Sequence, residues 1–192
     1  RRHAPMNRPV TLLVLLLAGL LAGCGGGSRP TGIRAAETPA DDVAEYQPRW
    51  RSHTVDSTQY RKVFLAGTID MGRSADWQAA LVARFRDSIG GRWLFFNPRR
   101  REFHASPAEM EYQVAWELAH LEAADLIVMN LLGDSRSPIS LLEMGLYARS
   151  GKLFVACSPD YYRYDNVRIT CRRYGVPLYD SLTALLDDLP QQ

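Results

Sequence analysis

A buried strand followed at once by a helix start lies in the middle of the chain. Residues 126–132 form a continuous apolar run broken only by Asn130, which is typical of a strand buried on both faces of a parallel sheet. Polar turn residues follow this run. Ser137 is then positioned to cap a helix whose first residue is Pro138. A strand that leads directly into a helix is the repeating unit of α/β folds, so this stretch favours that fold class.

The same alternation extends to both sides of this stretch. Further apolar runs predict strands at 62–67, 92–97, 152–157 and 176–179. Helical spacing and capping residues predict helices over 76–89, 107–123, 138–150, 168–174 and 181–189. Short links between these elements imply right-handed crossovers. We therefore expect residues 60–192 to form one doubly wound α/β domain, flavodoxin-like or Rossmann-like, with about five mainly parallel strands and helices on both faces.

The segment before this domain has the pattern of an exported lipoprotein. An apolar run from Val10 to Leu21 follows Arg8, and it is too short to span a membrane. The run ends in small residues before Cys24. We expect residues 1–23 to be a signal peptide, with 1–5 upstream of the true start, although a buried N-terminal helix is the alternative. Cys24 would then be lipidated and anchor the protein to the bacterial cell envelope, on the periplasmic side.

Residues 24–59 are predicted to be a flexible tether, because they contain three consecutive glycines and several prolines but few large apolar residues. The formal net charge of +2, with no long basic face, gives no support for nucleic-acid binding. The four histidines are scattered, so we expect neither a metal nor another cofactor. An exported compartment permits a disulfide between Cys157 and Cys171. We favour the other interpretation, in which both are small buried hydrophobes.

Two glutamates lie within apolar helical stripes. Glu143 falls between Ile139 and Leu146 in the helix after the central strand, and Glu117 lies in the apolar stripe of the preceding helix. These stripes are formed by Ile139, Leu142 and Leu146 in one helix, and by Met110, Val114, Leu118 and Leu121 in the other. Burying a carboxylate in a core costs free energy unless it is paired. Each glutamate is therefore either a structural residue with a hydrogen-bonding or ionic partner, or a residue that takes part in function.

The placement of the Glu143 helix favours a working role. It starts just past the carboxyl end of a central strand, where open α/β sheets keep their ligand crevice. For Glu117 the alternative is an ion pair with a neighbour such as Arg99. The other side chains expected at this edge are Gly67, Thr68, Asp70, Asn97, Arg99, Asn130 and Ser137. Two carboxylates with amides and hydroxyls, and no metal cluster, suit chemistry at an anomeric carbon.

Four motifs together carry a resemblance to a known family. They are Val63-Phe64-Leu65-Ala66-Gly67, Asn97-Pro98-Arg99-Arg100, Gln113-Val114-Ala115-Trp116-Glu117-Leu118 and Ser137-Pro138-Ile139-Ser140-Leu141-Leu142-Glu143. With them the chain resembles the nucleoside 2-deoxyribosyltransferase superfamily, and is most similar to its transferase-like branch. The resemblance extends over residues 62–186.

The resemblance implies an enzyme of N-glycosidic bonds that acts on nucleosides or nucleotides, by 2-deoxyribosyl transfer or by hydrolysis. It implies that Glu143 is the nucleophile that forms a covalent sugar intermediate, and that Glu117 helps to bind or activate the sugar. Enzymes of the family carry a base-contacting Asp six residues before the nucleophile, where this chain has Ser137. Two alternatives stay open: a glycohydrolase of NAD or ADP-ribose type, and a non-catalytic lipoprotein that binds a nucleotide or docks a protein. A homo-oligomer is compatible with each.

Overall fold

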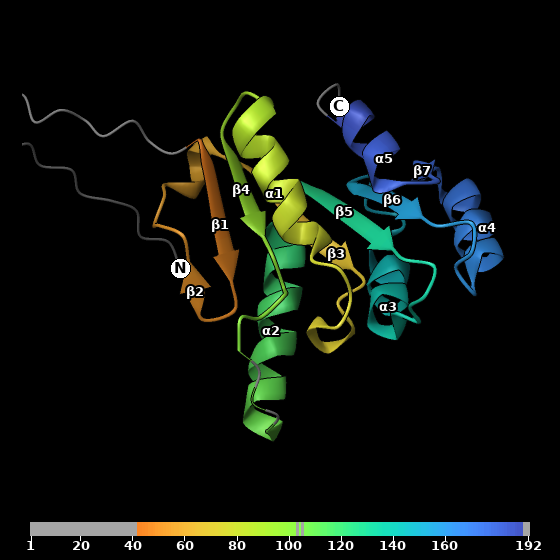
Figure 1. Ribbon diagram of the computed structural model, residues 1–192, viewed down its shortest axis with the longest axis horizontal. Coiled ribbons are helices and arrows are strands. Elements are labelled where there is room, and N and C mark those ends of the chain that lie inside the picture. The colour runs from red at the N-terminus through yellow and green to blue at the C-terminus, as the bar shows by residue number, and fades with distance from the viewer. Residues whose placement is uncertain (1–41, 103, 105, 190–192) are drawn as a thin grey trace, which may run out of the picture. The chain divides into compact units, whose positions relative to one another are not determined.

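A computed structural model describes residues 42–189 except 103 and 105, and all of them belong to one compact unit, Pro39–Gln192 (Figure 1). The strands are β1 (Val43–Gln47), β2 (Trp50–Arg51), β3 (Arg61–Gly67), β4 (Trp93–Phe96), β5 (Leu126–Leu131), β6 (Leu153–Cys157) and β7 (Leu178–Tyr179). The α-helices are α1 (Trp77–Ser88), α2 (Pro107–Ala123), α3 (Pro138–Tyr147), α4 (Tyr164–Tyr174) and α5 (Leu182–Asp188). Two short 3-10 helices are η1 (Ser57–Gln59) and η2 (Asp70–Gly72).

All these strands join one sheet in the order β2-β1-β4-β3-β5-β6-β7, and every pair is parallel except β1 with β2. The predicted doubly wound α/β fold is therefore confirmed, with seven strands in place of about five. The helices cover both faces. Side chains of α2, α3 and α4 pack on one face of the sheet, and side chains of α1 and α5 pack on the other.

The two additional strands come from the predicted tether, which is a correction to its boundary. β1 pairs in parallel with β4, and Val43 and Ala44 are buried in the two opposite cores. A short alternating segment was enough to extend the sheet, because the edge of β4 offered unpaired backbone groups. The folded domain therefore begins before residue 60. Residues 1–41, with the predicted signal peptide and Cys24, lie outside the described residues.

The order of the strands creates a crevice between β3 and β5. From β3 the chain passes to β4 on one side, and later returns to β5 on the other side. Helices that leave two neighbouring strands in opposite directions leave a gap at the carboxyl ends of those strands. Gly67 ends β3 at this gap with φ +124°, and a Cβ there would lie 2.2 Å from the backbone oxygen of Asn130. The position therefore requires glycine.

The predicted inward faces of α2 and α3 are wrong, although both helices are confirmed. Ile139, Leu142 and Leu146 have exposed fractions of 57–61%. The buried residues of α3 are Ser140, Glu143 and Met144. In α2 the stripe of Met110, Val114 and Leu118 is also exposed, and its only buried residue is Leu121. Each helix has apolar residues around much of its circumference, so the spacing did not identify which side meets the sheet.

The two remaining cysteines are free and buried, as the favoured interpretation predicted. Cys157 ends β6 and Cys171 lies in α4, and both belong to the same core. Burial raises the pKa of Cys157 to about 12 and that of Cys171 to about 11, so neither is a reactive thiolate at neutral pH. Within the described part of the chain, no helix has the length and hydrophobicity needed to cross a membrane.

Candidate active site

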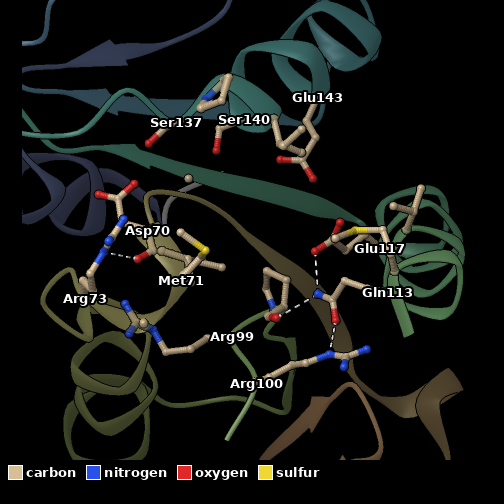
Figure 2. Close-up of a pocket in the computed structure, with 18 of the residues that line it drawn as sticks. Asp70, Met71, Arg73, Arg99, Arg100, Gln113, Glu117, Ser137, Ser140 and Glu143 are labelled. Atoms are coloured by element: carbon tan, nitrogen blue, oxygen red, sulfur yellow. Dashed lines mark hydrogen bonds between the residues drawn. The ribbon is translucent and has the colours of Figure 1, made fainter. Parts of the chain in front are cut away.

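A cavity of about 620 Å³ opens at the carboxyl ends of the central strands. Its walls come from four segments: η2 after β3, the loop after β4, α2, and the first turns of α3. Figure 2 shows Glu143 and Glu117 reaching this space from two different helices. The predicted convergence of the two carboxylates on one hollow is therefore what the fold produces.

Glu143 lies near the middle of α3, and its side chain turns from the helix into the cavity (Figure 2). The residue is 8% exposed, and none of the described residues donates a hydrogen bond to its carboxylate or pairs with it. Burial, and secondarily the negative charge of Glu117, raises its pKa to about 8. Glu143 is thus a poorly hydrated acid without a structural partner, which distinguishes it from a core carboxylate held by an ion pair.

Glu117 is held from one side. The Gln113 side-chain amide, one turn earlier in α2, donates to Glu117 Oε1 at 2.6 Å and to the backbone oxygen of Pro98 at 3.1 Å. Gln113 Oε1 in turn accepts a hydrogen bond from Arg100 Nε. Burial raises the pKa of Glu117, against the hydrogen bond from Gln113 and the positive charge of Arg100. The predicted alternative, an ion pair of Glu117 with Arg99, does not form, because Arg99 pairs with Asp76 instead.

A chain of hydroxyl groups links the end of β3 and η2 to the residue before α3. Ser137 Oγ lies 2.8 Å from Thr68 Oγ1 and 2.7 Å from Ser135 Oγ, and Ser135 donates to Asp70 Oδ1 at 2.9 Å. Ser137 precedes α3 as predicted, but its hydroxyl makes no capping hydrogen bond. Its φ of +40° is the left-handed region that favours glycine. The chain of hydroxyl groups joins the ends of β3 and β5 and holds Asp70 in place.

The predicted site residues divide into those that line the cavity and those behind its wall. Gly67, Asp70, Arg99, Glu117, Ser137 and Glu143 line it. Thr68, Asn97 and Asn130 do not, because they are buried and support the wall. Asn97 Nδ2 donates to Glu45 Oε1 at 2.7 Å, so this amide ties the loop after β4 to β1. These three residues were predicted to contact the ligand, whereas the structure places them outside the cavity lining.

Arg99 lines the cavity, but its guanidinium is held by the fold. Its Nε donates to Gln78 Oε1 at 3.2 Å, and one Nη donates to Ser74 Oγ and to the backbone oxygen of Ala75, each at 3.0 Å. Arg99 is 8% exposed. This arginine therefore joins the loop after β4 to the start of α1 and leaves little donor capacity for a ligand.

Several lining residues were missing from the predicted site. Gln113 and Ser140 lie one helical turn before Glu117 and Glu143 on the same faces, a spacing that could have identified them. Met71 lies in η2 and Arg73 directly follows it, and Asp70 and Met71 both have positive φ. No periodic pattern marks such a loop in the sequence, so its approach to the cavity appears only in the structure.

The arrangement combines a buried acid without a partner, a second acid fixed by an amide, and an open space beside both. Such a pair can stabilise or attack a carbon that develops positive charge and can move a proton at the same centre. No three His, Cys, Asp or Glu side chains among residues 42–189 with their two gaps are grouped to hold a metal ion.

Comparison with known proteins identifies a family that the chain matches. The family model described as "Nucleoside 2-deoxyribosyltransferase like" matches residues 60–161, which is more than half of the chain. The matched region runs from just before β3 to the segment after β6 and includes both glutamates. No curated protein matches the chain.

Proposed function

This chain belongs to the nucleoside 2-deoxyribosyltransferase-like family, and we propose that it cleaves the N-glycosidic bond of nucleosides or nucleotides. The observation that carries this proposal is the pair of carboxylates in one cavity. Glu143 and Glu117 line the same space, and the charge of Glu117 raises the pKa of Glu143, so the two groups lie within electrostatic reach of each other.

In the proposed mechanism Glu143 is the nucleophile. Its ionised carboxylate attacks C1′ of the sugar, a bond forms between its Oε and C1′, and the C1′–N bond breaks with its electron pair leaving on the base. Glu117 orients the sugar and gives a proton to the departing base, and it takes a proton back from the attacking group in the next step. Water or a second base then attacks C1′ and releases Glu143. We favour water, because an exported protein meets scavenged nucleosides more readily than a pool of free bases.

Release of free base from a substrate panel tests the proposal. The purified protein is incubated with ribonucleosides, deoxyribonucleosides, their 5′-monophosphates and NAD, and the free base is measured by chromatography. We expect Glu143→Gln to lower the rate by at least about a thousandfold, since it removes the nucleophile. Glu111→Gln, an exposed change on α2, is the matched control and should leave the rate unaltered. Equal release by the wild type and Glu143→Gln would count against the proposal.

A non-catalytic nucleotide-binding protein is the second candidate. The observation that favours it is the Ser137 hydroxyl, which is bonded to Thr68 and Ser135 and stands where the related enzymes have a base-contacting Asp. Thermal stabilisation by a nucleotide without release of base from any substrate, in the wild type and in Glu143→Gln alike, would support binding over catalysis.

We also propose that the protein is anchored to the cell envelope through Cys24. The apolar run that ends in Leu21-Ala22-Gly23-Cys24 supports this location. Replacing Cys24 by Ser should move the protein from the membrane fraction to the soluble fraction, whereas Ser28→Ala should leave it at the membrane. A Cys24→Ser protein that stays in the membrane fraction would contradict the anchor.

A further inference from the structure

Four arginines line the cavity, and two of them already have carboxylate partners. Figure 2 shows Arg99 and Arg100 across the cavity from Glu143. Arg99 Nε lies 3.4 Å from Asp76 Oδ1, and Arg100 Nη1 lies 2.7 Å from Glu109 Oε2. The charges of these two arginines are balanced within the fold, so they do not by themselves require an anionic ligand.

The other two, Arg73 and Arg101, have no carboxylate partner among the described residues. Arg73 Nε donates to the backbone oxygen of Asp70 at 3.2 Å, and Arg101 Nε donates to Gln47 Oε1 at 3.3 Å. The guanidinium carbon of Arg101 also lies 3.9 Å from the ring centre of Trp50, which fixes the plane of the guanidinium. Both arginines are exposed, and their terminal nitrogens make no hydrogen bond to any described residue.

The carboxyl groups that line the cavity form no ion pair with Arg73 or Arg101. Burial raises the pKa of Glu143 to about 8, so this carboxyl group is largely uncharged at neutral pH. Asp70 accepts a hydrogen bond from Ser135 and forms no ion pair with Arg73. Guanidinium groups stay charged at any physiological pH. The cavity therefore favours a ligand with a negative group at its arginine side.

Arg101 lies where this cavity meets a second hollow. The second hollow has a volume of about 410 Å³ and shares Arg100 and Arg101 with the first, and Trp50 and Glu102 also line it. Glu102 forms no ion pair with Arg101, although it is the next residue along the chain. The two hollows thus adjoin at Arg100 and Arg101.

We infer that the ligand is a phosphate ester of a nucleoside, and that its phosphate binds Arg101 at the junction of the two hollows. A planar guanidinium held against an aromatic ring presents two parallel donors, which match two phosphate oxygens. The inference rests on the proposed function for the nucleoside part of the ligand. It adds that a free nucleoside lacks the group that this arginine binds, and that a substituent beyond the phosphate is accommodated.

Calorimetric binding to the Glu143→Gln protein tests this inference, because that change blocks turnover during the measurement. The probes are a deoxynucleoside, its 5′-monophosphate, and a dinucleotide joined by a diphosphate. We expect the monophosphate to bind at least about tenfold more tightly than the nucleoside, as for other hydrogen bonds to charged groups. The dinucleotide should bind no more weakly than the monophosphate. Adding Arg101→Gln should bring the ratio of nucleotide to nucleoside affinity close to one.

Arg86→Gln, an exposed change on α1 outside both hollows, is the matched control and should keep that ratio. Equal affinities for nucleoside and monophosphate, rejection of the dinucleotide, or a ratio that survives Arg101→Gln would each overturn the inference. Wild-type turnover separates this result from the proposed function. Equal cleavage of nucleoside and nucleotide would support the proposed enzymatic activity and contradict the phosphate site. Nucleotide binding that depends on Arg101, without any release of base, would support the phosphate site and contradict the proposed enzymatic activity.

Discussion

Glu143 ionises in surroundings that oppose its negative charge in two ways. Its side chain is buried, and Glu117 adds a second carboxylate to the same cavity, so the pKa of Glu143 rises to about 8. A carboxylate with so high a pKa is a stronger nucleophile than an ordinary one once it has lost its proton. The nucleophilic form is consequently the minor form at neutral pH.

The pH dependence of kcat/KM follows from this. Because the ionised form of Glu143 attacks, we expect kcat/KM to rise with pH and to level off above about 8. Glu117→Gln removes the neighbouring charge. This variant should be less active, and the rise of its kcat/KM with pH, the rising limb of the profile, should occur at lower pH than in the wild type. Glu111→Gln, which lies away from the cavity, should leave the limb in place. A rate that falls across this range, or a limb that stays in place in Glu117→Gln, would contradict Glu143 as the nucleophile coupled to Glu117.

At the scale of elements, the close approach of β3 to β5 holds the two halves of the site together. Gly67 pairs with Asn130, and Thr68 beyond it donates its backbone N–H to the oxygen of Asn130 at 2.9 Å. The Thr68 side chain also accepts from the backbone N–H of Leu132 at 3.1 Å. The end of β3 is thus fixed to the segment that leads into α3 and Glu143.

Gly67→Ala should therefore be severely destabilising. The new Cβ would lie 2.2 Å from the oxygen of Asn130, which is backbone in the middle of the sheet and cannot move aside, and φ is +124°. We expect a loss of about 3 kcal/mol or more in the free energy of unfolding, measured by urea denaturation. Gly145→Ala in α3 is the matched control. No atom lies near the added methyl there, and the change should stabilise by up to about 1 kcal/mol. Equal stabilities for the two variants would contradict the close approach.

The sequence predicted the helices and the central strands well, because each depends on local signals. Asp76, Ser106 and Ser181 cap α1, α2 and α5 through hydrogen bonds to backbone N–H groups, and such caps can be identified from residue type. The inward faces of α2 and α3 could not be predicted in the same way. Ser140, Glu143 and Met144 are buried while Ile139 and Leu142 are exposed, and only the packing of the whole fold decides which side of the helix is covered.

At the scale of the whole molecule, alternation of strand and helix was sufficient to predict the crevice. The two glutamates beside it were identified from helical stripes whose predicted inward orientation was wrong. Alternation fixes which strand ends meet, because parallel strands joined by right-handed crossovers have few arrangements. It does not determine which polar side chains form hydrogen bonds within the protein and are therefore not available to a ligand. Asn97 was lost to Glu45 of β1 and Arg99 to residues around the start of α1, and both partners come from segments distant in the chain. The arginines without a carboxylate partner could be recognised only after the partners of the others were known.

The stability of the whole molecule should also depend on Glu143. The pKa of this group is about 8 in the folded protein, against 4.5 as its ordinary value. The folded state therefore holds the proton more tightly, and the free energy of unfolding should fall as pH rises between these two values. Each pKa unit corresponds to about 1.4 kcal/mol, so the wild type should lose several kcal/mol across this range.

Glu143→Gln has no proton to lose and isolates this effect. Urea denaturation at pH 5 and at pH 9 should show that the free energy of unfolding of the variant, relative to that of the wild type, is higher at pH 9 than at pH 5. The variant is thus relatively more stable at high pH although it has lost activity. A carboxylate stabilised by a structural ion pair would give the reverse sign, because its folded pKa would lie below the ordinary value and its removal would destabilise the protein most at high pH. Parallel stability curves for the two proteins would mean that Glu143 is hydrated, and the case for a desolvated nucleophile would then fail.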